Sequence, residues 1–310
     1  MNKITIVGVG CVGSTIAYTL STLGVAAEIA LIDINHEKTM GEALDIKQGV
    51  PFGYPTNIYA GTYEDAKDSN IVIITSGVAR KPGQSRLELA QVNVNILKNV
   101  ADNIVKYAPN AIYIIVSNPV DVLTYVFCKH TGLPESKIIG SGTLLDTSRL
   151  RSRISECYSV NPKSVHAYVL GEHGDTAFVP WSTANISNIP VEDYTRASKN
   201  LIPFSKDDAE EYVRKSGAKI ISQKGATYYA VSAAVVHLCK CILGGMDSAV
   251  TISTMLHGEY GVDDVCLSLL NLINKDGVIE KVMLPLTDDE IKKLHVSAEK
   301  LKEVIRSVEI

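Results

Sequence analysis

The first residues of the chain form an apolar, β-branched strand pattern that runs directly into a glycine-rich turn and then a helical pattern. The strand pattern covers residues 4–9, and the turn with GxGxxG spacing consists of Gly8, Val9, Gly10, Cys11, Val12 and Gly13. A second apolar segment, 29–32, ends on Asp33, 20 residues beyond Gly13. Glycines alone would be weak evidence, but this order of strand, turn, helix and acid is typical of a dinucleotide-binding α/β unit.

Each part of this pattern has a physical reason. Gly8 permits the tight turn, Gly10 lets a pyrophosphate approach the backbone, and Gly13 lets helix and strand pack closely. The start of the helix offers free N–H groups and a positive dipole to the phosphates. Asp33 would accept hydrogen bonds from the adenosine ribose and repel a 2′-phosphate, so we expect NAD rather than NADP. The expected cofactor-binding residues are Gly8, Gly10, Cys11, Val12, Gly13 and Asp33.

The alternation of strands and helices continues to about residue 142 and then loosens. Buried strand patterns lie at 71–74, 112–116 and 137–140, and helical patterns lie at 37–48 and 87–106. Farther along, antiparallel strand patterns occur at 165–170, 180–186, 189–191, 249–256 and 265–272, and helical patterns at 206–223, 228–243 and from Thr287 onward. We predict an α/β protein: a Rossmann-type doubly wound parallel sheet in an NAD-binding domain at 1–142, then an α+β substrate domain at 143–310.

Composition excludes several classes of partner. The 310 residues carry a net charge of −4, with 30 Lys and Arg against 34 Asp and Glu, which predicts no binding of nucleic acid or of an anionic membrane. No apolar run reaches the roughly 18–20 residues of a membrane helix, and because the N-terminal residues read directly into a strand pattern, we expect no leader segment. The six cysteines are scattered without a CxxC pair. We therefore expect reduced thiols, no metal site and a cytoplasmic location.

A histidine between glycines is the leading candidate for proton transfer. It lies in the run Gly171, Glu172, His173, Gly174 and Asp175. Histidine titrates near neutral pH, so His173 could move a proton in catalysis. The simpler alternative is that this run is only a polar turn after a strand. Asp146 and Arg149 have i,i+3 spacing on a helical stretch and share one face; a surface ion pair is the alternative there. Asn118 follows the strand at 112–116, where it could bind substrate or nicotinamide.

The loop at 78–86 is unusually basic. Pro82 and Gly83 interrupt any helix, and the three cations are Arg80, Lys81 and Arg86. A doubly wound sheet binds its ligands at the carboxyl ends of its strands, where this loop begins. It is therefore either a solvated basic loop or a lid that closes over a bound anion.

With these pieces assembled, the chain resembles the lactate/malate dehydrogenase family along essentially its whole length. Besides the glycine-rich turn and Asp33, the matching motifs are Ser117-Asn118-Pro119-Val120-Asp121, Leu145-Asp146-Thr147-Ser148-Arg149, Gly171-Glu172-His173-Gly174-Asp175 and Gly225-Ala226-Thr227-Tyr228-Tyr229. The resemblance implies reversible transfer of a hydride between NADH and a small 2-keto acid, with a 2-hydroxy acid as product.

The same resemblance implies residue roles that agree with this chemistry. His173 would exchange the proton of the substrate oxygen, and Asp146 would hold its imidazole and stabilise the imidazolium. Arg149 would bind the substrate carboxylate through a bidentate fork, and Arg86 would polarise the C2 carbonyl. The residues implied to line the same pocket are Asn118 and Thr227.

Substrate choice depends on Arg80. In this family the corresponding loop position carries Gln in the lactate type and Arg in the malate type. A second arginine would pair with the distal carboxylate of oxaloacetate, so Arg80 favours malate and oxaloacetate as substrates. Thr227 and Val231 are of the lactate type, and the alternative is therefore an L-lactate dehydrogenase acting on lactate and pyruvate.

The resemblance also bears on regulation and assembly. Arg151 and His166 match positions that bind fructose 1,6-bisphosphate in allosteric members, and a surface arginine and an ordinary half-buried histidine are the alternative. The family forms homodimers and homotetramers. The helices at 144–157 and 228–243 are the expected interface.

Two readings from other classes are weaker. An NAD-dependent glycosidase would need a metal held by Cys and His, and His173 has no cysteine motif at comparable spacing. A non-catalytic NAD-binding protein would have no use for the combined set of His173, Asp146, Arg149 and Arg86.

Overall fold

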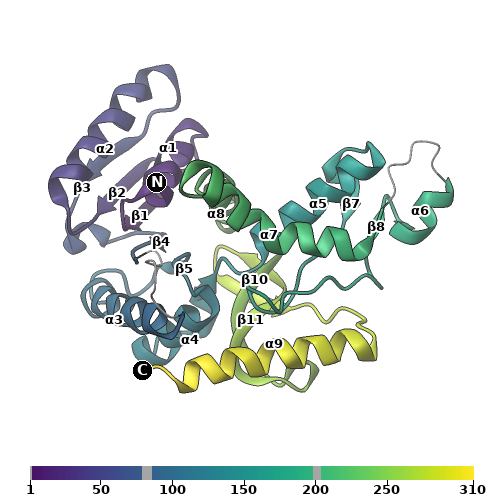
Figure 1. Ribbon diagram of the computed structural model, residues 1–310. Coiled ribbons are helices and arrows are strands. Elements are labelled where there is room, and N and C mark those ends of the chain that lie inside the picture. The colour runs from purple at the N-terminus through teal and green to yellow at the C-terminus, as the bar shows by residue number, and fades with distance from the viewer. Residues whose placement is uncertain (1, 79–85, 198–203) are drawn as a thin grey trace.

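A single nine-stranded sheet runs through the molecule, with helices on both of its faces (Figure 1). The computed structural model describes residues 2–78, 86–197 and 204–310. Six parallel strands form one side of the sheet: β1 (Lys3–Val7), β2 (Glu28–Ile32), β3 (Asn57–Ala60), β4 (Ile71–Ile74), β5 (Ile112–Ile115) and β6 (Ile138–Gly140). Their spatial order 3-2-1-4-5-6 is that of a doubly wound dinucleotide fold, which confirms the predicted fold class.

The parallel strands are apolar throughout because both faces of the sheet are covered. In β4, Ile71 and Ile73 join one core cluster, whereas Val72 and Ile74 join the other. The first cluster is closed by α1 (Cys11–Thr22), α2 (His36–Gly49) and α8 (Tyr229–Leu243). The second is closed by α3 (Arg86–Ile104), α4 (Val120–Thr131) and α9 (Asp288–Arg306).

The C-terminal half extends the same sheet in antiparallel fashion. Its strands are β10 (Ser248–His257), β11 (Asp263–Asn274) and β12 (Gly277–Lys281). β10 pairs with β6 through Ser253 and Gly140. A side chain at Gly140 would overlap Thr124 and lie 2.8 Å from the Ser253 Cβ, so this seam requires glycine. The N-terminal and C-terminal halves therefore share one continuous hydrogen-bonded sheet.

A smaller group of elements with its own core packs outside the nine-stranded sheet. It contains α5 (Leu144–Tyr158), α7 (Lys206–Lys224) and a three-stranded sheet of β7 (Val165–His166), β8 (Asn185–Ile186) and β9 (Ile189–Pro190), followed by α6 (Val191–Ala197). A third core cluster joins α5, α7 and this sheet. In Figure 1, α9 runs below β10 and β11 toward α3 and α4, and its end is held there by the backbone N–H of Glu309, which donates to Gln91 Oε1 at 2.8 Å.

Five details differ from the sequence-based expectation, the first being that the strand expected at 180–186 covers only Asn185–Ile186 (β8). Strands β3 and β12 carry too few consecutive apolar residues to be recognised, and both lie at sheet edges. The strand expected at 165–170 is only two residues long, because the backbone then turns toward β11. The strand expected at 189–191 gives way at Val191 to α6, whose first turn carries Glu192 and Asp193; acids there favour a helix.

Candidate active site

The glycine-rich turn between β1 and α1 has two glycines required by packing and one that leaves space. Gly8 has φ +96°, and a Cβ there would lie 2.5 Å from the backbone nitrogen of Ser76. A Cβ at Gly13 would overlap the carbonyl oxygen of Gly8. At Gly10, in contrast, no described atom beyond the adjacent residues lies within 4 Å of the Cβ position. The protein itself does not need glycine at this position, and the free space fits a phosphate approaching the start of α1.

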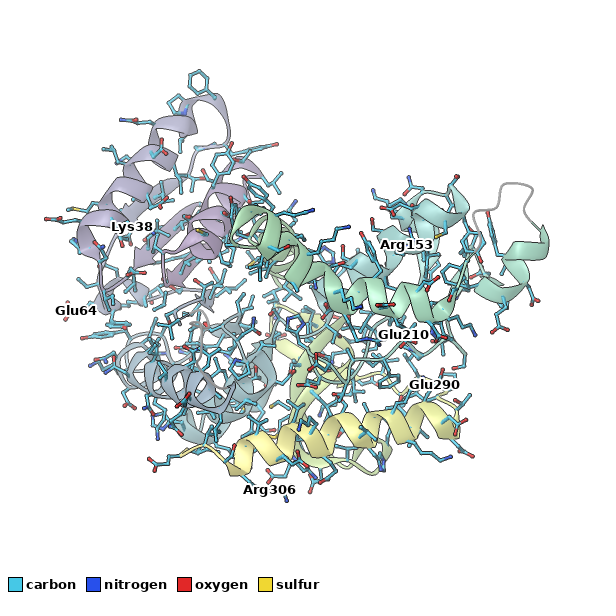
Figure 2. All side chains as sticks on the ribbon, in the orientation of Figure 1. Lys38, Glu64, Arg153, Glu210, Glu290 and Arg306 are labelled. Atoms are coloured by element: carbon cyan, nitrogen blue, oxygen red, sulfur yellow. The ribbon has the colours of Figure 1, made fainter. Side chains whose placement is uncertain are left out.

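Asp33 lies at the end of β2 on the wall of a cavity of about 510 Å³ that also includes Gly8 and Gly10. Its carboxylate accepts hydrogen bonds from the backbone N–H of Val9 at 2.6 Å and of Asn35 at 3.0 Å. Lys38 on α2, labelled in Figure 2, donates from Nζ to the carbonyl of Val9 at 2.8 Å. The acid predicted to bind the ribose is thus fixed against the turn predicted to bind the pyrophosphate.

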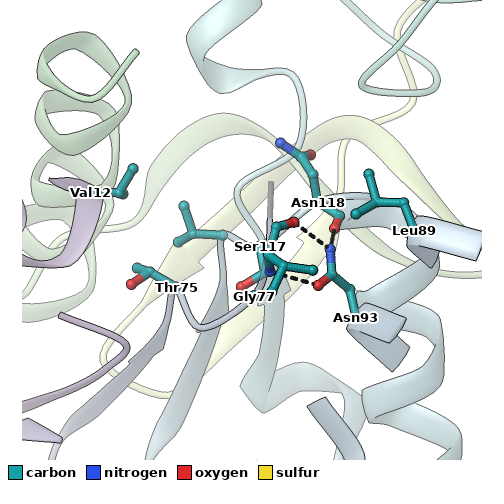
Figure 3. Close-up of a pocket in the computed structure, with 9 residues that line it drawn as sticks. Val12, Thr75, Gly77, Leu89, Asn93, Ser117 and Asn118 are labelled. Atoms are coloured by element: carbon teal, nitrogen blue, oxygen red, sulfur yellow. Dashed lines mark hydrogen bonds between the residues drawn. The ribbon is translucent and has the colours of Figure 1, made fainter. Parts of the chain in front are cut away.

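A second cavity, of about 300 Å³, continues from this turn along the carboxyl ends of β4 and β5. Figure 3 shows its walls, which include Val12 of the turn, Gly77 after β4, and Asn118 after β5. Asn118 also lines the cavity that contains His173. The described residues therefore form a continuous path from Asp33 to His173, and this path suits an extended dinucleotide.

His173, Asp146 and Arg149 come together as the sequence predicted. His173 Nδ1 lies 2.5 Å from Asp146 Oδ2, and Arg149 Nη1 donates to Asp146 Oδ1 at 2.8 Å. The Asp146 charge raises the pKa of His173 to about 9, against the opposing effect of burial. Burial opposes the charge of Asp146, which is 5% exposed, but the positive charges of His173 and Arg149 outweigh it and lower the pKa of that carboxyl. At neutral pH the pair is therefore an imidazolium and a carboxylate.

The chain holds this pair in place from α5. Thr143 Oγ1 donates to the carbonyl of Val169 at 2.5 Å, and Thr147 Oγ1 accepts from the N–H of Val169 at 2.9 Å. These two threonines flank Asp146, and Val169 precedes His173 by four residues. Gly171 then exchanges two backbone hydrogen bonds with Ser268 of β11, at 2.9 and 3.0 Å. These hydrogen bonds therefore hold α5, which carries Asp146, against the loop that carries His173.

Two more residues support the histidine loop and were missed by sequence reasoning. Asp121 Oδ2 accepts the backbone N–H of His173 at 2.8 Å, and burial raises the pKa of this acid to about 6. Ser297 of α9 accepts the N–H of Glu172 at 2.6 Å. The sequence does contain a signal for Asp121, because an acid within a mainly apolar helical segment is expected to be buried and bonded; residues 120–128 are all buried.

The substrate-sized cavity has a volume of about 380 Å³ and contains His173, Arg149 and Thr227. Its wall on α7 includes Arg214, whose Nη1 lies 3.2 Å from Oε2 of Glu210, labelled in Figure 2. The cavity is completed by the apolar residues Val12, Val116, Leu145, Ala177, Val213, Ala218, Ile221 and Val231.

Four remaining residues predicted from the sequence either lie away from this cavity or fall outside the residues that the structure describes. Arg80 and the side chain of Arg86 lie outside the described residues; the backbone of Arg86 begins α3. Arg151 donates from Nε to the carbonyl of Ala167 at 3.0 Å. His166 is exposed on β7 and does not line the catalytic cavity.

Searches for similar proteins agree with this geometry. The family model of the lactate/malate dehydrogenase NAD-binding domain matches residues 2–140, and that of the alpha/beta C-terminal domain matches residues 143–309. An L-lactate dehydrogenase from Thermoanaerobacterium saccharolyticum is 43% identical over 311 residues, covering 100% of both chains. An L-lactate dehydrogenase from Acetivibrio thermocellus is 44% identical, covering 100% of this chain and 98% of that protein. A crystal structure of a minor L-lactate dehydrogenase from Enterococcus mundtii superposes with a TM-score of 0.96 at 37% identity, covering 100% and 99% of the two chains.

These relatives overturn one expectation. The preference for malate and oxaloacetate that we drew from Arg80 is wrong, because relatives that match along the whole chain are named L-lactate dehydrogenases. Arg80 is one charged residue of a loop, whereas substrate choice depends on the whole pocket. Among the described residues, the pocket wall beyond Arg149 is largely apolar, and its other arginine, Arg214, is paired with Glu210.

The searches also bear on the cofactor. The path from Gly10 to Asn118 and the match to an NAD-binding domain identify NAD as the cofactor. The chain belongs to the lactate/malate dehydrogenase family and is an NAD-dependent oxidoreductase.

Proposed function

We propose that this protein is an L-lactate dehydrogenase that interconverts pyruvate and L-lactate. The observation that carries the proposal is the joined set of His173, Asp146 and Arg149 in a cavity whose other walls are mainly apolar. Arg149 suits the one carboxylate of pyruvate, and the apolar wall suits its methyl group. A second carboxylate would be desolvated there at a large cost in free energy. The names of the relatives support the same substrate pair.

The chain's own residues account for proton transfer and substrate binding. NAD, when bound, supplies the hydride exchange at the substrate C2. His173 Nδ1 is engaged by Asp146, so Nε2 is the nitrogen that gives the proton to the substrate oxygen or takes it back. The Asp146 charge favours protonated His173, the form that pyruvate reduction requires. Arg149 keeps further donors beyond the one used by Asp146, and these would bind the substrate carboxylate.

Several assignments from the sequence remain part of this proposal. We assign polarisation of the C2 carbonyl to Arg86 and a further substrate contact in the same loop to Arg80. Asn118 and Thr227 would contact substrate, and both line the catalytic cavity. Cofactor binding is assigned to the turn, including Cys11 and Val12, and to Asp33. The domain division at 142/143 is supported by family models that end at 140 and begin at 143.

The direct test compares kcat/KM for pyruvate and oxaloacetate with NADH, measured side by side. We expect pyruvate to be favoured by about 10²-fold or more, since the described wall of the cavity is mainly apolar beyond Arg149 and its Arg214 is already paired with Glu210, so a second carboxylate would be desolvated there. Equal values, or an excess for oxaloacetate, would contradict the proposed substrate.

Cofactor choice is tested at Asp33. Asp33→Asn keeps an acceptor for the Val9 N–H but removes the negative charge. The ratio of NADPH to NADH affinity is expected to rise by about 10-fold or more, because hydrogen bonds from the ribose to a charged carboxylate are worth on the order of 1.5–3 kcal/mol and the repulsion of a 2′-phosphate is removed as well. Glu37→Gln, an exposed acid in the first turn of α2, is the matched control and should leave the ratio unchanged. An unaltered ratio in Asp33→Asn would remove Asp33 from the assignment.

Regulation and assembly are also proposed. We assign a fructose 1,6-bisphosphate site to Arg151 and His166, supported by their proximity: Arg151 is bonded to Ala167, the neighbour of exposed His166. A homodimer or homotetramer is the proposed assembly. The proposed location is the cytoplasm, which the six free thiols support. Among the described residues, none of the helices is both long and apolar enough to cross a bilayer.

Titration with fructose 1,6-bisphosphate tests this site. The pyruvate half-saturation concentration is expected to fall by about 5-fold or more, a common size for allosteric coupling, and Arg151→Gln should abolish the response. Wild-type kinetics that do not change with the bisphosphate would eliminate the site.

A further inference from the structure

A buried asparagine joins the two loops that form the nicotinamide end of the cofactor path. Asn93 lies on α3 and is 3% exposed, between residues that pack into the core. Its Oδ1 accepts the N–H of Val78 at 2.9 Å, and its Nδ2 donates to the carbonyls of Val78 at 3.2 Å and Asn118 at 2.7 Å (Figure 3). A buried amide is costly unless bonded, so these three hydrogen bonds account for its presence in the core.

The segments that Asn93 connects follow neighbouring parallel strands. Val78 follows β4, and Asn118 follows β5. Ser117 Oγ adds a second link by donating to the carbonyl of Ser76 at 2.6 Å. The approach is close, since a Cβ on Gly77 would lie 3.2 Å from Asn93 Oδ1. The two loop bases are therefore held at a fixed separation.

Asn118 is the residue through which this link reaches the chemistry. Asn93 binds its backbone carbonyl, and the Asn118 carboxamide is turned away from Asn93 in Figure 3. Asn118 lines both the 300 Å³ cavity and the 380 Å³ cavity with His173. A shift of this backbone would displace the carboxamide from both.

We infer that Asn93 is a positioning residue: it fixes the backbone of Asn118 so that the carboxamide meets nicotinamide and substrate in reactive register. The inference rests on the proposed function. Reaction geometry is sensitive to displacements of about 1 Å, which can cost on the order of 10²-fold in rate. Asn93 acts only through Asn118 and Val78, and it is not itself a catalytic residue.

The test uses Asn93→Asp and Asn93→Ala. The aspartate keeps an acceptor for Val78 but loses the donors to both carbonyls, and the alanine introduces no buried charge. We expect kcat for pyruvate reduction to fall about 10²-fold in each. NADH affinity should fall about 10-fold, whereas affinity for ADP-ribose, which lacks nicotinamide, should stay within about threefold because the contacts at Gly10 and Asp33 persist. Asn103→Ala is the control: it lies on the same helix, and its amide donates to the carbonyl of Asn99 within α3 at 2.8 Å.

A double-mutant cycle separates positioning from general support of the fold. In an Asn118→Ala background the carboxamide is absent, so adding Asn93→Ala should cost about twofold at most in kcat/KM. Fully additive losses, or equal loss of NADH and ADP-ribose affinity, would overturn the inference, as would wild-type rates in Asn93→Ala. A wild-type enzyme that binds NADH but does not reduce pyruvate would instead overturn the proposed function.

Discussion

Replacing His173 with asparagine is expected to lower kcat for pyruvate reduction by about 10³-fold, within the range contributed by general acid catalysis. Asparagine offers a donor toward Asp146 but has no nitrogen that titrates near neutral pH. The cavities that would hold the cofactor are otherwise preserved, so the NADH dissociation constant should stay within about twofold. Stopped-flow kinetics measure kcat for pyruvate reduction, and NADH fluorescence measures the dissociation constant.

The chain offers a matched control for this variant. His130 forms a second histidine–aspartate pair, with Asp102 at 2.7 Å, away from the catalytic cavity. His130→Asn should retain wild-type kinetics. Loss of activity in His130→Asn, or retention of more than about a tenth of kcat in His173→Asn, would show that the proton is handled elsewhere.

Replacing Asp146 with asparagine is expected to change both the rate and its pH dependence. In the wild-type protein the Asp146 charge raises the His173 pKa to about 9. Pyruvate reduction needs protonated His173, so its kcat/KM should be high below this value and fall as pH rises through it. Without the charge, the falling limb should move toward the ordinary histidine value of 6.5. At pH 8 the loss should be about 10²-fold or more, since the imidazole also loses its orienting partner.

The direction of the reaction provides an internal check on this sign. Lactate oxidation needs neutral His173, so its rate should rise with pH through the same pKa, and the Asp146 variant should reach its plateau at lower pH. Asp102→Asn, which alters the pair with His130, should move neither limb. A limb that stays near pH 9 in Asp146→Asn would mean that a different group titrates there.

The fold was largely predictable because its strands are buried on both faces. Such strands read as continuous apolar runs, as at Ile71–Ile74 and Ile112–Ile115, and the glycine turn adds a constraint on backbone geometry. Edge strands lack this pattern. Residues Asn57–Ala60 and Gly277–Lys281 carry polar side chains toward solvent, so only pairing with a neighbouring strand identifies them.

The catalytic site was predictable only where its chemistry lies within local motifs. His173, Asp146 and Arg149 are recognisable from residue type and spacing, and the structure joins them. Supporting residues depend on long-range contacts: the hydrogen bond between Glu172 and Ser297 spans 125 residues of sequence. Substrate choice is a property of the whole pocket, and the charge of Arg80 alone led to the wrong acid.

The seam between β6 and β10 has a mechanical consequence. Gly140 and Ser253 are ladder partners in a joint that has no room for a side chain, and the strands on either side belong to the halves that contribute cofactor and substrate residues. Rotation of one half against the other would break the hydrogen bonds between β6 and β10. Because both halves belong to this one sheet, the position of the cofactor-binding residues relative to His173 is set by a continuous hydrogen-bonded layer. For the same reason, a chimaera exchanging either half must recreate the seam before it can recreate the catalyst.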